Sequence, residues 1–176
     1  MPRKLLNSEL PRLTPQDFKE VEKAPLVLVL DNIRSRHNIG AAFRTADAFC
    51  IAKIYLCGIC AIPPSAEIHK VALGAEDTVD WHYEQDVVTV VRALKQEGYT
   101  IVAVEQAENS TQLHEFKPER NKKYALIFGN EVKGVQQEVV DICDLVLEIP
   151  QWGTKHSLNV SVSIGVILWD IMEKLR

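Results

Sequence analysis

The chain has 176 residues, of which 47% are hydrophobic and 25% charged, with 20 lysines and arginines against 24 aspartates and glutamates. These proportions are typical of one soluble globular domain and exclude an intrinsically disordered chain. No apolar run is long enough to span a bilayer, and the first residues lack the apolar segment of a secretory signal. We therefore expect a cytoplasmic protein without a membrane partner.

The acidic residues are concentrated in one part of the chain. Residues 67–119 contain 4 basic and 11 acidic side chains, so the remainder is net basic. We expect the basic residues of the first 25 positions, of 34–36 and of 120–123 to form a surface for a polyanion, if the fold gathers them. For each residue alone, a solvated surface charge is the alternative interpretation.

The first 24 residues are polar and contain several prolines, and we expect an extension with one short helix that starts after Thr14. Residues 26–30 form a continuous apolar run, which predicts a central parallel strand. Asn38 then starts a helical pattern with one apolar face. That face is made by residues spaced three and four apart: Ile39, Ala42, Phe43, Ala46 and Phe49.

Short apolar runs and helical patterns alternate along the rest of the chain. Strands are expected at residues 53–56, 81–83, 100–104, 123–128 and 145–149. Helices are expected before Gly74, from an Asp86 cap to residue 96, and at residues 135–140 and 158–175. This alternation predicts an α/β fold with a mostly parallel sheet and helices on both faces, in a domain spanning residues 25–176.

Ligands of open α/β sheets bind beyond the carboxyl ends of the strands. Three of the loops expected there are polar and contain glycine: residues 31–40, 129–134 and 150–159. Gly40 in the first loop permits a close approach of another backbone. The glycine motif of dinucleotide-binding proteins and the phosphate loop are absent, which disfavours ordinary dinucleotide and nucleoside triphosphate chemistry.

Each residue of these loops also has a purely structural interpretation. Gly129 and Gly134 fit simple turns, Ser157 fits a helix N-cap, and Arg44 with Asp47 fits a surface ion pair. Three such loops at one sheet edge are harder to explain as turns, and together they indicate a ligand site.

Cys57 and Cys60 have the spacing of a redox or metal pair. They follow a strand rather than start a helix, and no second pair with ligand spacing accompanies them, which favours structural thiols. A redox or zinc protein remains the alternative. His37 and His156 lie in the candidate loops, but neither has a nucleophile near it in sequence.

In this order, the three loops resemble the three motifs of the SpoU/TrmH family of RNA ribose 2′-O-methyltransferases, which belong to the SPOUT class. Asn38-Ile39-Gly40 with Arg44 matches the first motif, residues 127–134 match the second, and residues 149–163 match the third. The resemblance runs from Leu26 to the end of the chain. It implies a deep trefoil knot in the C-terminal part, an exception to the rule that chains avoid knots, and it implies a homodimer.

The resemblance further implies S-adenosylmethionine as the cofactor and requires no metal. The residues that would line the cofactor pocket are Val104, Gly129, Ile149, Ser157 and Leu158. Aliphatic side chains and main-chain groups of this kind suit a pocket in which the backbone recognises an adenine ring.

Catalysis is assigned by the same resemblance to Arg44, which would reach the cofactor of the partner subunit. A guanidinium is nearly always protonated, so stabilising an alkoxide or pairing with a substrate phosphate is easier to defend than proton abstraction. Asn38 would position Arg44 or the ribose, Ser157 would lie close by, and Asn159 would brace the loops and the dimer contact. Glu131 shares that bracing role and is also a conceivable base.

The expected substrate is tRNA, with a guanosine of the D-loop as the target. Only a short extension precedes the first strand, whereas members of the family that act on ribosomal RNA often carry a separate N-terminal RNA-binding domain. Ribosomal RNA remains an alternative substrate. A non-catalytic RNA-binding or assembly factor on the same fold is the alternative from another class.

Overall fold

The computed structural model describes all 176 residues. Seven strands form a single sheet in the order β3-β2-β1-β6-β4-β7-β5, and every pairing in it is parallel. The strands are β1 (Ala24–Asp31), β2 (Ile51–Cys57), β3 (Trp81–Glu84), β4 (Tyr99–Val104), β5 (Thr111–Gln112), β6 (Lys123–Phe128) and β7 (Leu145–Glu148).

Helices connect most of these strands. They are α1 (Pro15–Glu20), α2 (Arg36–Ala48), α3 (Ala66–Ala72), α4 (Ala75–Thr78), α5 (Val87–Gln96), α6 (Gln137–Ile142) and α7 (Val160–Leu175), with a 3-10 turn η1 at Asn7–Glu9. The expected α/β fold with helices on both faces of a parallel sheet is confirmed. The expected trefoil knot stays a prediction.

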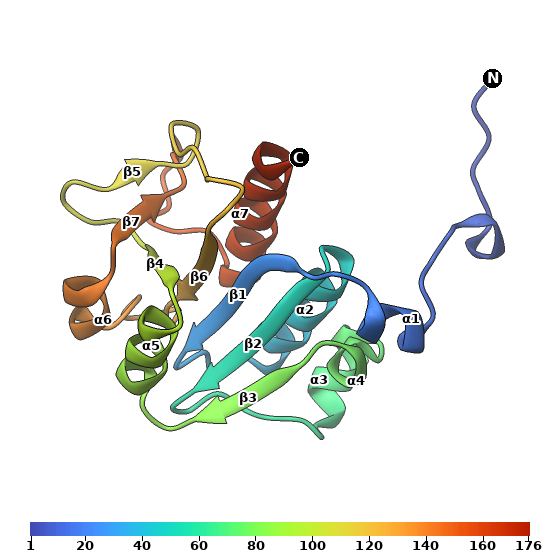
Figure 1. Ribbon diagram of the computed structural model, residues 1–176, viewed down its shortest axis with the longest axis horizontal. Helices are drawn as coiled ribbons and strands as arrows, with labels where there is room; N and C mark the ends of the chain where they lie inside the picture. Colours follow the sequence, from blue (N-terminus) through green and yellow to red (C-terminus); the bar gives the residue numbers. More distant parts are fainter.

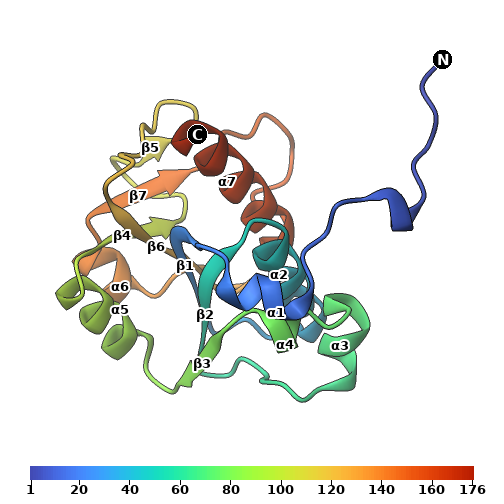
Figure 2. The ribbon, with the colours of Figure 1, turned by 45° about the vertical axis from the view of Figure 1, so that its right-hand side comes forward.

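The sheet has a hydrophobic core on each face because the side chains of β1 alternate. Leu26, Leu28 and Leu30 belong to the core under α2 and α7, whereas Val27 and Val29 belong to the core under α5 and α6. Figures 1 and 2 show α2 and α7 side by side on one face, with α5 and α6 on the other.

Two helices begin at other residues than the sequence predicted, because capping side chains decide where a helix begins. The helix expected from Asn38 begins at Arg36, because the Ser35 hydroxyl accepts a hydrogen bond from the Asn38 amide at 3.2 Å. The helix expected from Leu158 begins at Val160, because the Asn159 side chain accepts from the Ser161 amide at 2.9 Å. Helix α4 and the two-residue strand β5 were not predicted.

The expected close approach at Gly40 is made to another helix. A Cβ on Gly40 would lie 2.7 Å from the backbone oxygen of Ile68, so glycine lets α2 and α3 pack closely. This contact holds the first half of α2 against α3, and the second polar loop lies next to the start of α2, where Asn38 donates to Glu131.

The N-terminal extension has one packed part and one part that projects. Thr14 caps α1 as expected, and Phe18 is buried with the Lys23 ammonium 3.7 Å from its ring centre. The residues before α1 extend away from the rest of the molecule (Figures 1 and 2). Among the helices, none has the length and apolar composition needed to cross a bilayer.

Candidate active site

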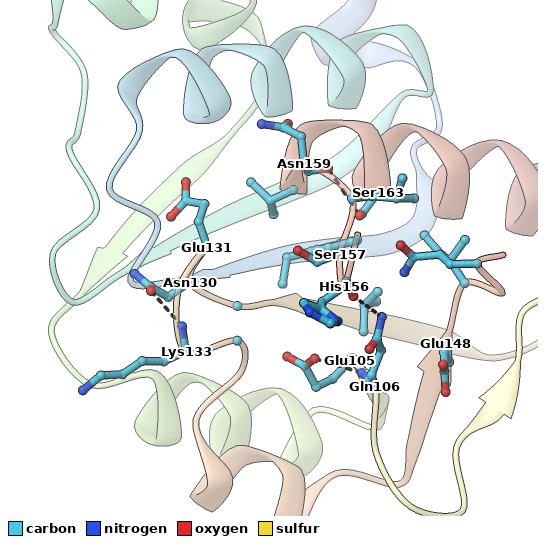
Figure 3. Close-up of a pocket in the computed structure, with 18 of the residues that line it drawn as sticks. Glu105, Gln106, Asn130, Glu131, Lys133, Glu148, His156, Ser157, Asn159 and Ser163 are labelled. Carbon is cyan, nitrogen blue, oxygen red and sulfur yellow. Dashed lines mark hydrogen bonds between the residues drawn. The ribbon is translucent and has the colours of Figure 1, made fainter. Parts of the chain in front are cut away.

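A cleft of about 530 Å³ lies at the carboxyl ends of β4, β6 and β7. Its lining includes all five residues expected to bind a cofactor, which are Val104, Gly129, Ile149, Ser157 and Leu158. Figure 3 shows the polar side chains that line it from three separate loops. The fold thus brings together residues as far apart in sequence as Val104 and Leu158, although contact with a ligand stays a prediction.

The loop after β6 is closed on itself by backbone hydrogen bonds. Asn130 and Gly134 exchange two of them, at 3.1 and 2.8 Å, and the Asn130 side chain accepts from the amides of Val132 and Lys133. A Cβ on Gly129 would lie 2.0 Å from the backbone of Gly134 and Val135. The two glycines therefore make a tight loop whose backbone forms one wall of the cleft.

Two residues after β4 join this loop to the loop after β7. Glu105 accepts hydrogen bonds from the Val135 amide at 2.9 Å and the Gln106 amide at 2.8 Å. Gln106 donates through its side chain to the backbone oxygen of His156 at 2.7 Å. Sequence reasoning missed both residues, although Glu105 directly follows the predicted strand end at Val104.

A second anchor lies behind the cleft at the end of β1. The buried Asp31 carboxylate accepts from the Gln136 amide at 3.0 Å, from the Gln136 side chain at 2.7 Å and from the Asn32 side chain at 2.8 Å. The Asn130 side chain donates to the Asn32 backbone oxygen at 2.7 Å. Because these groups satisfy one another, they hold the loop after β6 against β1.

Three of the residues expected to be catalytic form a hydrogen-bonded cluster at the rim of the cleft. Asn38 donates to Glu131 at 3.0 Å, and Asn159 donates to Asn38 at 3.3 Å. These residues come from the start of α2, the loop after β6 and the start of α7. The cluster joins the three predicted motifs at one point, and Ser157 lines the same cleft.

Arg44 is not among the residues that line this cleft. It is exposed on α2 and takes part in none of the ion pairs within the protomer. The alternative interpretation as a surface pair with Asp47 is wrong, since Asp47 accepts instead from the Thr78 hydroxyl at 2.8 Å. Ser157 is likewise not the cap of the last helix, because Asn159 fills that position.

Cys57 and Cys60 are buried free thiols. Cys60 accepts from the Ile33 amide at 3.2 Å and donates to the Leu30 backbone oxygen at 3.3 Å. Burial raises the pKa of Cys60 to about 11 and raises the pKa of Cys57 further. Thiols held this way are protonated and unreactive at neutral pH, in agreement with the structural role predicted for them. The other two cysteines, Cys50 and Cys143, are half-buried free thiols.

The chemistry of the cleft fits a ligand with an aromatic ring and hydrogen-bonding edges. Its apolar lining comes from Val104, Phe128, Leu147, Ile149 and Leu158 among others, and its volume lies in the range of small-molecule sites. Gly129 lines the cleft and has no side chain, so its backbone atoms form this part of the wall. The residues present therefore fit a nucleoside-like group such as the predicted cofactor.

Comparison with known proteins finds the same architecture. The model of the SpoU rRNA Methylase family matches residues 25–169. The chain is 33% identical over 151 residues to the 23S rRNA (guanosine-2'-O-)-methyltransferase RlmB of Neisseria meningitidis, covering 86% of this chain and 59% of that protein. It is 32% identical over 167 residues to the tRNA (guanosine(18)-2'-O)-methyltransferase of Aquifex aeolicus, covering 94% of this chain and 76% of that protein.

Two solved structures are similar as well. The A. aeolicus TrmH/SpoU tRNA modifying enzyme superimposes with a TM-score of 0.77 at 30% identity, covering 89% of this chain and 78% of the other. The AdoMet-bound rRNA methyltransferase of Sinorhizobium meliloti superimposes with a TM-score of 0.80 at 25% identity, covering 94% of this chain and 62% of the other. The chain spans only about three fifths of the length of the ribosomal RNA methyltransferases that it matches.

Proposed function

This chain belongs to the SpoU rRNA methylase family, and from this membership we propose that it methylates the 2′-oxygen of a ribose in RNA with S-adenosylmethionine as the cofactor. The observation that carries the proposal is the convergence of three loops on one cleft, with Asn38, Glu131 and Asn159 bonded to one another at its rim. The AdoMet-bound relative supports the choice of cofactor.

The residues that hold the cofactor in this proposal are Val104, Gly129, Ile149, Ser157 and Leu158. The aliphatic side chains would pack on the faces of the adenine ring, and backbone groups of the loop after β6 would pair with its edge. When bound, S-adenosylmethionine would supply a methyl group on a sulfonium, and the neutral thioether that departs as S-adenosylhomocysteine is a good leaving group. The protein therefore has mainly to orient the ribose hydroxyl and manage its proton.

Arg44 is the proposed catalytic residue. A guanidinium is a cation, so Arg44 would stabilise the negative charge that develops on the 2′-oxygen as the hydroxyl loses its proton. Glu131 is an exposed carboxylate that lines the cleft, and in this proposal it accepts that proton. Asn38 holds Glu131 through their 3.0 Å hydrogen bond and so positions this group.

We propose that Arg44 acts on the cleft of a partner subunit in a homodimer, because it does not line the cleft of its own protomer. Helix α7, which packs beside α2, leaves an apolar face uncovered at Val162, Val166 and Trp169, with 50%, 37% and 58% of each residue exposed. These residues recur every three or four positions and so share one side of the helix. A second copy of this chain covers that face in the proposed dimer.

We propose tRNA as the substrate, with a guanosine of the D-loop as the target. Support comes from the A. aeolicus tRNA relative, because the match includes 94% of this chain and 76% of that protein. Ribosomal RNA is the alternative, because several relatives are named as 23S rRNA methyltransferases.

The test is transfer of a labelled methyl group from S-adenosylmethionine to total tRNA and, separately, to ribosomal RNA. We expect Arg44→Ala to lower the rate about 100-fold or more, since a group that stabilises developing charge is typically worth that much. Arg92→Ala, an exposed arginine on α5 across the sheet, serves as the matched control and should keep full activity. Full activity in Arg44→Ala would overturn its role, and no transfer to either RNA would favour a non-catalytic RNA-binding factor.

A further inference from the structure

A second cleft of about 560 Å³ lies at the same sheet edge, on the other side of the start of α2. Its walls come from the first residue of α2, the loop after β2, the start of α3 and the end of β3. Arg36, Ile62, Pro64, Glu67 and Tyr83 line it. None of these residues takes part in the first cleft.

The polar wall of the second cleft is an exposed ion pair. Arg36 donates through Nη1 to the Glu67 carboxylate at 3.3 Å, and about half of each side chain is exposed. Glu67 also accepts from the Ser65 hydroxyl at 3.1 Å. A single long contact between exposed groups contributes little to stability, so the remaining donors of Arg36 and the acceptors of Glu67 are available to a ligand.

Glu67 is ionised at neutral pH. Its own backbone amide, the Ser65 hydroxyl and the Arg36 guanidinium lower its pKa below the ordinary value. The cleft therefore presents a carboxylate acceptor beside a guanidinium donor. A neutral ligand that offers donors and acceptors on adjacent edges matches this pair without adding charge.

The remaining walls of the second cleft suit a flat ring. The Tyr83 hydroxyl donates to the Gly58 backbone oxygen at 2.9 Å, which anchors the side chain. Ile62 is 43% exposed and lies with Pro64 on the loop after β2. Unstacked RNA bases are bound between aromatic or apolar side chains in this way and are then distinguished by hydrogen bonds to their edges.

Guanine is the base whose edges match the ion pair. Its O6 and N7 accept from arginine, and its N1–H and 2-amino groups donate to a carboxylate. Adenine presents an acceptor at N1, which a carboxylate repels, and it lacks the O6 acceptor. The charge arrangement at Arg36 and Glu67 therefore selects guanine.

The two clefts adjoin along the first turn of α2. Arg36 lines the second cleft, and Asn38, two residues further on, is bonded to Glu131 at the rim of the first. Resting on the proposed function, we infer that the second cleft binds an unstacked guanine base of the substrate RNA. Another part of the same strand places a ribose at the first cleft. Arg36 and Glu67 then determine which base is bound, whereas the groups at the first cleft carry out methyl transfer.

The test measures the affinity of short RNAs by fluorescence anisotropy, with the first cleft saturated by S-adenosylhomocysteine. Three pentanucleotides differ only at the centre: UUGUU, UUIUU with inosine, which lacks the 2-amino group, and UUAUU. We expect the guanosine RNA to bind about tenfold more tightly than the adenosine RNA and severalfold more tightly than the inosine RNA. Equal binding of guanosine and adenosine RNAs would overturn the inference.

Glu67→Gln keeps the shape of the side chain and removes its charge, and we expect it to abolish the preference for guanosine over inosine. Glu173→Gln, which removes the carboxylate from the exposed pair with Arg176, is the matched control and should keep that preference. If Glu67→Gln keeps the preference for guanosine over inosine, the assignment of Glu67 as the acceptor of the guanine 2-amino group is contradicted. Competition by free GMP at the affinity of the pentanucleotide would identify a free-nucleotide site and would also contradict it.

The two proposals fail in different ways. Glu67→Gln should bind S-adenosylhomocysteine as the wild type does, because Glu67 is absent from the first cleft. Absence of S-adenosylhomocysteine binding in the wild type would refute the proposed function, whereas normal cofactor binding without base preference would refute only the guanine site.

Discussion

At the scale of single residues, the carboxylates around the first cleft have two distinct roles. Glu131 is exposed at the rim, whereas Asp31 is fully buried and Glu105 is half-buried, and both of these accept backbone amides from the loop after β6. A buried carboxylate is stable only when hydrogen bonds replace the water that it loses. Asp31 and Glu105 therefore position the loop, and Glu131 is free of such contacts with backbone amides, as its proposed role at the substrate requires.

Glu105→Gln tests this positioning role. The amide retains one acceptor for the Val135 amide but presents an NH₂ group to the Gln106 amide, so one hydrogen bond is lost. We expect KM for S-adenosylmethionine to rise about tenfold, because hydrogen bonds to a charged group are each worth about 1.5–3 kcal/mol and the neutral amide weakens one and loses the other, while kcat changes little. Steady-state kinetics on RNA would measure both values.

The control for this change is Glu108→Gln, because Glu108 is an exposed carboxylate in the same loop. It should leave both kinetic constants unchanged. A fall in kcat at constant KM in Glu105→Gln would show that Glu105 acts on the reaction itself rather than on the loop.

The site residues that sequence reasoning found lie in recognisable motifs, whereas the ones that it missed do not. Asn38, Glu131 and Asn159 occur in motifs with a recognisable order, and the structure joins them by hydrogen bonds. Glu105 and Gln106 follow a strand as many loop residues do, and only the folded contacts to Val135 and His156 reveal their roles. Spacing in sequence carries no information about those contacts.

At the scale of elements, sequence patterns predicted the long helices and the buried strands, and capping chemistry decided their ends. Periodicity reports where an apolar face begins, whereas a helix begins where a side chain caps it, as at Ser35 and Asn159. Strand β5 has two residues and pairs only with β7, so no local pattern could indicate it. Its existence depends on a partner 36 residues away.

Asp86→Ala tests the contribution of one such cap. Asp86 accepts from the amides of Val88 and Thr89 at 3.1 and 3.2 Å at the start of α5. We expect the free energy of unfolding to fall by about 1 kcal/mol at neutral pH, as for other N-caps. Urea unfolding would measure the change, with Gln96→Ala on the exposed side of the same helix as the control.

The effect of this cap depends on pH. The hydrogen bond from the Thr89 hydroxyl, together with the backbone amides, lowers the pKa of Asp86 below the ordinary value of 3.8. A carboxylate with a lowered folded pKa stabilises the fold above the unfolded pKa and loses that contribution as pH falls through the folded one. The difference between wild type and Asp86→Ala should therefore shrink below about pH 4. A difference that stays constant down to acid unfolding would contradict the role of the charge.

At the scale of the whole molecule, alternating elements predicted a parallel sheet but not the order of its strands. The order places β6 between β1 and β4, which brings the loops after β4, β6 and β7 to one cleft. Strand order is decided by pairings between residues roughly 100 positions apart, such as Leu26 with Tyr124. Local patterns do not specify such pairings, so the order required the structure.

The proposed dimer makes a prediction at this scale. Val166→Asp places a charge on the exposed apolar face of α7, and burial of that charge against a second copy would be unfavourable. We expect the wild type to sediment as a dimer and Val166→Asp as a monomer with an unchanged circular dichroism spectrum. Leu73→Asp, at a residue 65% exposed on another surface, is the control and should stay dimeric. A monomeric wild type would remove the support for Arg44 acting across subunits.

The central claim is that the three loops form a site for S-adenosylmethionine, and calorimetry with its product S-adenosylhomocysteine tests that claim most directly. A Cβ on Gly129 would lie 2.0 Å from the backbone of Gly134 and Val135, whereas a Cβ on Gly153 would meet no atom within 4 Å. We predict binding of the product by the wild type and by Gly153→Ala, and an affinity at least about tenfold weaker in Gly129→Ala, because the loop must shift. Absence of binding by the wild type, or equal affinity in all three proteins, would contradict the account.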